Sequence, residues 1–312
     1  MIAPASSDIT GLTRLRAWLI ERLGGLRDRA PIEHQLISTW HRGDHTVHYL
    51  RFTYGYDWIP AYLLLPTDAP NPLPTVIALH QHNGQWQLGK REPAGFAGDL
   101  LQNYGERLVE AGFAVLIPDG MCFEERASAT MDGPTYERYV AMYEFLHGRS
   151  LTALMVSDVM ASVDLLSAFP QVDTSRVGLI GHSMGGTLTL WSAALDARIK
   201  AAFVNCGLAS LATIVRDEVI HCFMNYVVGQ LPACDHPQLA AMVAPRALMI
   251  SAGCRDIIFP CDGIHDTHDF ALGTYDALAV PEKLSLHLED CGHAFTPTMH
   301  AAALAFFNRW LT

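Results

Sequence analysis

Residues 176–190 read RVGLIGHSMGGTLTL, the most informative stretch of the chain. Its first part is apolar and rich in β-favouring residues, as in a short buried strand. The motif GHSMG follows at residues 181–185, and the small and apolar residues after it suit a helix packed on a sheet. A G-x-S-x-G motif between a strand and a helix predicts a nucleophilic serine, Ser183, at a sharp turn. The alternative is a tight turn with an incidental serine, which the flanking strand and helix disfavour.

The two glycines of the motif, Gly181 and Gly185, lie two residues either side of Ser183. A serine at the apex of so tight a turn has a strained backbone, so these neighbours must lack a Cβ. The helix that starts at Ser183 points free N–H groups and its positive dipole end at the reacting group. The stretch therefore predicts both a nucleophile and a place where negative charge is stabilised.

Composition excludes several classes of protein. The chain has 312 residues, of which 50% are hydrophobic and 17% charged, as in a compact globular protein. Its formal net charge of -11 argues against nucleic acid and membranes as partners. No secretion signal is evident at the N-terminus, and we see no stretch that approaches the length of a membrane span. Seven cysteines without disulfide-scaffold spacing indicate reduced thiols, so we expect a cytoplasmic protein.

Alternation of strands and helices from about residue 73 predicts an α/β fold with a mostly parallel central sheet and helices on both faces. Two alternating strands within residues 46–65 predict an antiparallel N-terminal edge. We expect a single domain over residues 1–312, with a helical extension at 1–44 and two long loop insertions near the active site, at 119–150 and 207–244. Loops of this length inside a compact domain are usually functional.

A serine hydroxyl needs a base to remove its proton and a third group to orient that base. In this fold the partners follow in the order Ser, Asp or Glu, His. Asp256 follows the predicted strand ALMIS, and His293 follows the predicted last strand SLHLE. We predict Ser183, Asp256 and His293 as the catalytic residues. The competing acids are Asp262, Asp266 and Asp290, and Asp256 is favoured because its loop directly follows a core strand.

The tetrahedral oxyanion needs two hydrogen-bond donors. We expect one from the backbone N–H of Met184 and another from the backbone N–H of Gln81 or His82, in the loop after the strand at 73–79. His80 and His82 could instead be a metal pair, since side chains two apart on an extended chain face the same way. We find no third ligand at diagnostic spacing and predict no metal and no other cofactor.

Aromatic residues in the two insertions suggest a substrate pocket with apolar walls. For this pocket we name Trp86, Cys122, Phe123 and Tyr226. Arg126 could pair with an acidic substrate, but we expect an ion pair with Glu124 or Glu125.

The motifs also carry a family resemblance. In chain order, LHQHNGQWQLGKREPAG, VLIPDGMCFEERA, GHSMGG, APRALMISAGCRD and CGHAF resemble the dienelactone-hydrolase-like and acetyl-xylan-esterase-like branch of the α/β-hydrolase superfamily. The resemblance covers about residues 45–312 and implies an α/β-hydrolase fold with the triad named above. Dienelactone hydrolase itself has a cysteine nucleophile where Ser183 stands, which favours ordinary carboxylic esters as substrates.

We therefore expect a serine hydrolase that cleaves small carboxylic esters through an acyl-enzyme intermediate. One alternative is an amidase or peptidase with the same triad. The other is a non-catalytic binding protein with an α/β-hydrolase fold, although such proteins typically lack a triad member.

Overall fold

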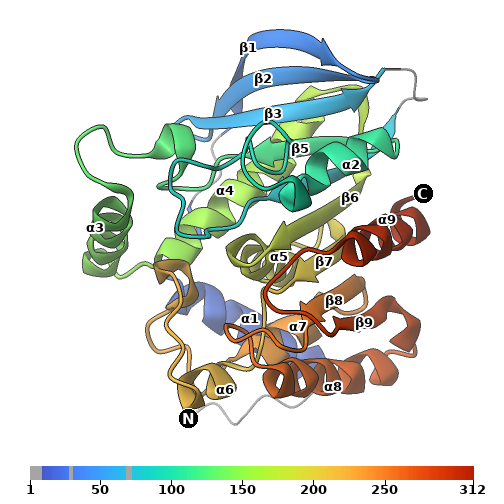
Figure 1. Cartoon of the computed structure of the whole chain (residues 1–312). Coiled ribbons are helices and arrows are strands. Elements are labelled where there is room, and N and C mark those ends of the chain that lie inside the picture. Colours follow the sequence, from blue (N-terminus) through green and yellow to red (C-terminus); the bar gives the residue numbers. More distant parts are fainter. Residues whose placement is uncertain (1–8, 28–30, 68–71) are drawn as a thin grey trace.

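One sheet passes through the whole molecule (Figure 1). The structure, a computed structural model, describes residues 9–27, 31–67 and 72–312. Within them nine strands lie in the spatial order β1-β2-β3-β5-β4-β6-β7-β8-β9. β1, β2, β3 and β5 pair antiparallel in turn, and every pair from β5 onward to β9 is parallel. The strands are β1 (Glu33–Arg42), β2 (His45–Thr53), β3 (Ile59–Pro66), β4 (Leu73–Leu79), β5 (Ala114–Pro118), β6 (Val172–His182), β7 (Ile199–Asn205), β8 (Ala247–Gly253) and β9 (Leu284–Glu289).

Helices cover both faces of this sheet, and a separate hydrophobic core lies on each face (Figure 1). The smaller core includes side chains of α2 (Tyr104–Glu110) and α9 (Pro297–Leu311). The larger core includes side chains of α1 (Ile9–Arg22), α4 (Leu151–Leu165), α5 (Met184–Leu195), α7 (His236–Val243) and α8 (Cys261–Ala277). The predicted α/β architecture, with a mostly parallel sheet covered on both faces, is confirmed.

The N-terminal extension differs from the prediction, because residues 1–44 are not purely helical in the described part. Glu33–Arg42 forms β1, which pairs with β2 at the edge of the sheet. Almost every residue of β1 is exposed, so the strand has no apolar alternation that a sequence pattern could register.

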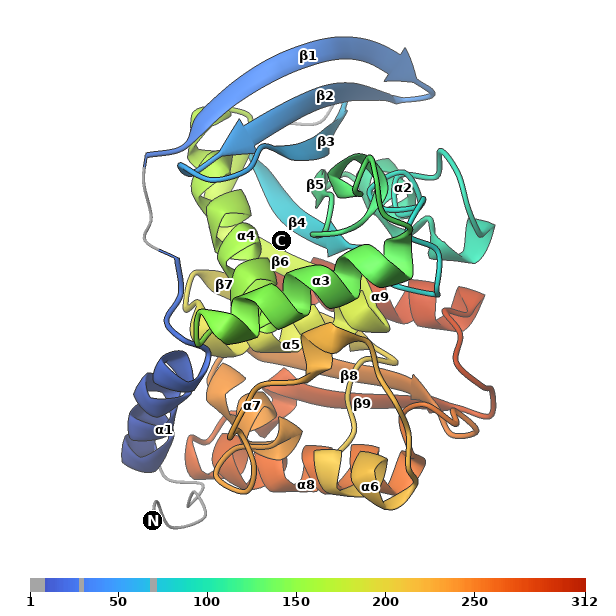
Figure 2. The same ribbon diagram turned by 90° about the vertical axis from the view of Figure 1, so that its left-hand side faces the viewer.

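The two insertions also contain more structure than the irregular loops we expected. The first holds α3 (Gly133–Leu146), which lies in front of the sheet in Figure 2. α3 begins where the Asp132 side chain accepts a hydrogen bond from the Thr135 N–H, with a proline in its first turn. The second insertion holds α6 (Leu211–Arg216), a 3₁₀ turn at Phe223–Asn225 and α7.

One helical stretch does reach the length of a membrane span, contrary to our expectation. Residues 151–168, which comprise α4 and the turn after it, are long and apolar enough by composition to cross a bilayer. This segment is 83% buried inside the protein, where it forms part of the larger core. Its apolar character is that of a helix surrounded by other elements.

Candidate active site

The turn between β6 and α5 has the geometry of a strained elbow. Ser183 has a φ of 56° and a ψ of -120°, an unusual conformation for a residue with a side chain. A Cβ on Gly181 would lie 2.2 Å from the Gly185 backbone, and one on Gly185 would lie 2.0 Å from the Leu79 carbonyl oxygen. Only glycine fits at either position, which holds Ser183 at the apex where its side chain is partly exposed.

His293 and Asp256 meet beside this elbow. The His293 Nδ1 lies 2.6 Å from Asp256 Oδ2, although the residues are far apart in sequence. The other carboxylate oxygen, Oδ1, accepts hydrogen bonds from the N–H groups of Ile258 (2.8 Å) and Phe259 (3.3 Å). Because the carboxylate accepts from Nδ1–H, the Nε2 of His293 is left to accept a proton.

The three competing aspartates lie elsewhere. Asp262 pairs with Arg216 at the surface, and the exposed Asp290 pairs with Arg255. Asp266 is exposed on α8. Among these carboxylates, Asp256 is the one that contacts His293.

Asn205, which sequence reasoning missed, ties the parts of the site together. Its carbonyl accepts from the Ser183 N–H (2.9 Å), and its Nδ2 donates to His182 Nδ1 (2.8 Å) and to the Ala294 carbonyl (3.0 Å). Asn205 is the last residue of β7, next to the end of β6 in the sheet, and this position is the signal that could have indicated it.

His182 lies against the catalytic histidine, with its ring centroid 4.6 Å from that of His293. Burial lowers the pKa of His182 well below its usual range, so the ring stays neutral. A neutral neighbour does not oppose the positive charge that His293 acquires when it takes a proton.

Met184 and the loop after β4, which are the two predicted sources of oxyanion donors, line the same cavity. Met184 is the first residue of α5, so its N–H has no partner within the helix. The Gln81 side chain donates to Glu92 (3.1 Å), which anchors the loop after β4. Gln81, His82, Met184, Ser183 and His293 all line one cavity of about 500 Å³.

His80 is built into the fold. Its Nδ1 lies 2.8 Å from the Gln81 carbonyl, and its Nε2 accepts from the Gly120 N–H at 2.9 Å. Burial lowers its pKa to about 4, so the ring is neutral and both nitrogens are used by the backbone. His80 therefore braces the loop after β4 against the end of β5.

His82 belongs to a cluster around the buried carboxylate of Glu137, on α3. Glu137 Oε2 accepts from His82 Nε2 (2.8 Å) and from Trp86 Nε1 (3.0 Å), and Oε1 accepts from the Phe223 N–H (3.3 Å). The His82 tautomer is set by Gly84, whose N–H donates to His82 Nδ1 at 3.0 Å. Glu137 thus joins both insertions to the loop that carries the predicted oxyanion donors.

Potential metal ligands come together more closely than the sequence indicated. His82, Glu137 and Cys222 place one ligand atom each within 4.8 Å of one another. However, the His82 Nε2 carries the proton that it donates to Glu137. Burial raises the pKa of the Cys222 thiol to about 12, so it is not a thiolate. Within this group, the hydrogen bond joins His82 to Glu137, and the Cys222 sulfur accepts from Asn225 instead.

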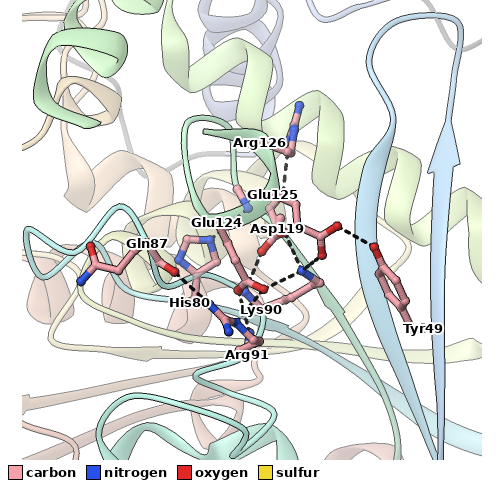
Figure 3. A network of polar contacts seen from close by, with 10 residues as sticks. Tyr49, His80, Gln87, Lys90, Arg91, Asp119, Glu124, Glu125 and Arg126 are labelled. Carbon is pink, nitrogen blue, oxygen red and sulfur yellow. Dashed lines mark hydrogen bonds and ion pairs between the residues drawn. The ribbon is translucent and has the colours of Figure 1, made fainter. Parts of the chain in front are cut away.

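A second network of charged residues, drawn in Figure 3, joins the segment after β4 to the end of β5. The ammonium of Lys90 lies between three carboxylates, those of Asp119 (2.9 Å), Glu124 (2.7 Å) and Glu125. Burial alone would lower the pKa of Lys90, but the carboxylates outweigh it and hold the pKa above its usual value. Lys90 occupies the space between these acids, and Tyr49 of β2 donates to Glu125 at 2.5 Å.

Arg126 does not pair with Glu124 or Glu125 as we expected. Both of these acids contact Lys90, and Arg126 instead donates to Asp158 of α4 at 2.6 Å. The pair is buried, so Arg126 does not reach the substrate cavity.

The predicted pocket residues separate into three groups. Trp86 lines the catalytic cavity. Cys122 and Phe123 are fully buried and do not line it; Phe123 packs its ring against those of His80 and His82. Tyr226 lines an adjoining cavity.

The comparisons with known proteins identify the family of the chain. The sequence profile of the dienelactone hydrolase family matches residues 59–303. "Putative hydrolase YtaP" of Bacillus subtilis is 26% identical over 300 residues, which cover 95% of this chain and 98% of that protein. A 4-O-methyl-glucuronoyl methylesterase of Cerrena unicolor is 28% identical over 245 residues, 65% of this chain and 48% of that protein. Among solved structures, a glucuronoyl esterase from Solibacter usitatus superimposes with a TM-score of 0.70 at 16% identity, covering 98% of this chain and 94% of the other.

The family match spans most of the chain, so the protein belongs to the dienelactone hydrolase family. It is a hydrolase of the carboxylesterase type, and the family resemblance inferred from the sequence is confirmed.

Proposed function

We propose that this protein hydrolyses carboxylic esters through a Ser183–His293–Asp256 triad and an acyl-enzyme intermediate. The observation that carries the proposal is the 2.6 Å contact between His293 Nδ1 and Asp256, beside a serine in a strained elbow that lines the same cavity.

In the first half-reaction the Ser183 Oγ attacks the ester carbonyl while His293 Nε2 takes its proton. Asp256 keeps the proton of Nδ1 in place and stabilises the imidazolium that forms. The carbonyl oxygen becomes negative and accepts from the N–H of Met184 and from that of Gln81 or His82. His293 then returns the proton to the leaving alcohol, and the C–O bond breaks.

In the second half-reaction water takes the place of the alcohol. His293 removes a proton from water, which attacks the acyl-enzyme carbonyl, and the acid leaves as Ser183 recovers its proton. Every proton passes through His293, so the cycle requires no cofactor and no metal.

The experiment is Ser183→Ala, assayed with p-nitrophenyl acetate and with a fluorophosphonate probe. We expect turnover to fall by at least about 10⁴-fold, because only binding and oxyanion stabilisation remain. Labelling should disappear, whereas the control Ser128→Ala, at a half-buried serine in the loop before α3, should be labelled like the wild type. Wild-type turnover by a folded Ser183→Ala variant would refute the mechanism.

We also propose that the protein works in a reducing compartment, the cytoplasm. All seven cysteines are free in the structure, which supports this proposal. Detection of the protein in a cytosolic fraction would test it.

A further inference from the structure

A second cavity, of about 820 Å³, adjoins the catalytic cavity. It is formed mainly by residues 211–231 of the second insertion, together with Phe145 of α3. Four residues line both cavities: Ile220, His221, Phe223 and Asn225. The groove therefore lies directly beside the cavity that Ser183 lines.

The lining of the groove carries no Asp, Glu, Lys or Arg among the residues that the structure describes. Its polar side chains are neutral, and three of their buried atoms have no hydrogen-bond partner in the described part of the protein: His221 Nε2, Asn225 Oδ1 and Gln230 Nε2. The Tyr226 hydroxyl accepts from the His221 N–H (3.2 Å), and Asn225 donates to the Cys222 sulfur (3.3 Å). Burial lowers the pKa of the His221 ring to about 4, so it is uncharged at neutral pH. The groove therefore offers mainly hydrocarbon contacts.

Large apolar side chains in the groove are left open to water. Val215 is 67% exposed, Ile220 88% and Val228 70%. A concentration of exposed apolar residues beside a cavity is typical of a binding site for an apolar ligand.

We propose that this groove binds a hydrocarbon chain or ring carried by the ester substrate, so that the preferred substrates are esters with a large apolar group. The inference rests on the proposed function. The four shared lining residues are the reason to assign the groove to the substrate, because a group bound in the groove lies next to the cavity in which Ser183 meets the ester carbonyl. The apolar group could belong to the acyl or to the alcohol part, and the two ester series below separate these cases.

The first measurement is kcat/KM along two series of esters. One series runs from p-nitrophenyl acetate to octanoate and lengthens the acyl part; the other runs from ethyl to octyl acetate and lengthens the alcohol. Full burial of one methylene would raise kcat/KM by a factor of about 4. A groove that is open on one side buries roughly half of each methylene, so we expect kcat/KM to rise about 2-fold per methylene. One series should rise by roughly 50-fold over its six added methylenes.

The second measurement uses variants in the groove. Val215→Asp and Val228→Asp place a charge where the chain would lie, and each should lower the ratio of kcat/KM for the long ester to that for the short ester by about 10-fold or more. Leu36→Asp is the matched control, because Leu36 is 57% exposed on β1, at the far edge of the sheet. This control should keep the wild-type ratio.

The outcomes separate the two proposals. Turnover of short esters that is lost in Ser183→Ala but does not depend on chain length in either series overturns the groove assignment and leaves the proposed function standing. A chain-length preference that Val215→Asp and Val228→Asp leave unchanged also overturns it. A wild-type dimer that Val228→Asp dissociates in analytical ultracentrifugation, with no chain-length preference, makes the groove an interface between copies instead. If no ester is hydrolysed, the proposed function fails and this inference fails with it.

Discussion

Glu137 offers the sharpest test of how the insertions support catalysis. In Glu137→Gln one side-chain oxygen remains to accept hydrogen bonds, whereas both carboxylate oxygens of Glu137 accept them in the wild type. If the amide oxygen takes the place of Oε2, the new NH₂ group faces the Phe223 N–H; in the other orientation it faces the donors of His82 and Trp86. The His82 ring cannot switch tautomer to compensate, because the Gly84 N–H already occupies Nδ1 as a donor.

The magnitude follows from these bonds. One buried donor without an acceptor costs about 1–3 kcal/mol, and the remaining two bonds lose the charge that strengthened them, about 1 kcal/mol each. We expect the free energy of unfolding of Glu137→Gln to fall by about 3–5 kcal/mol. We also expect kcat for p-nitrophenyl acetate to fall by roughly 10-fold with little change in KM, since the displaced loop carries donors that act on the oxyanion. Glu137→Ala frees the loop further and should approach the 10²–10³-fold loss, by order of magnitude, seen when an oxyanion donor is removed.

Glu144→Gln is the matched control. Glu144 is an equally buried carboxylate on the same helix, α3, but its partner is Arg149, and it does not line the catalytic cavity. It should lose stability in urea unfolding while its kcat stays at the wild-type value. Unchanged kcat in a folded Glu137→Ala variant would refute the positioning role, as would an equal loss of kcat in Glu144→Gln.

Four further predictions concern the triad, metal chemistry, the Lys90 network and pH. Asp256→Asn should lower turnover by roughly 10⁴-fold through the wrong histidine tautomer, and Asp290→Asn should not; the reverse result would reassign the acid. Activity should survive exhaustive dialysis against EDTA, and a loss that zinc or manganese restores would contradict the metal-free mechanism. Lys90→Met leaves buried carboxylates uncompensated and should lower the free energy of unfolding by about 3–5 kcal/mol in a urea titration, whereas the exposed Lys200→Met should change it by less than about 0.5 kcal/mol. Burial lowers the pKa of His80 to about 4, so below pH 6.5 the unfolded chain binds a proton that the folded protein excludes. The free energy of unfolding should therefore fall as the pH drops from 6.5 toward 4, by about 2 kcal/mol between pH 7 and 5. His80→Asn should remove this part of the pH dependence.

Features that depend on near neighbours in the chain could be predicted from the sequence. The elbow is such a feature, because the strand, the two glycines and the helix around Ser183 lie within fifteen consecutive residues. The continuous apolar run of β4 and the ends of β8 and β9 are equally local, which is why Asp256 and His293 could be proposed from their positions. Parallel strands bring such loop residues to one edge of the sheet, so the order of elements alone predicts that they lie close together.

Features that depend on which distant residues meet could not be predicted in this way. Arg126 was expected to pair with an adjacent acid, but the fold brings Asp158 to it and gives Glu124 and Glu125 to Lys90, some 35 residues earlier. A buried charged side chain pairs with the opposite charge that packing brings next to it, because an unpaired buried charge is costly. The separation of the two residues in the sequence has no influence on this cost.

Local sequence patterns were enough to predict the α/β architecture, the strained serine turn and the strand ends that carry Asp256 and His293. The contact between Glu137 and His82, 55 residues apart, and the apolar groove that the second insertion forms beside the catalytic cavity became visible in the folded chain. The physical reason is range: backbone propensity and apolar periodicity act over a few residues, whereas a hydrogen-bonded cluster or a cavity exists only once separate segments have packed together.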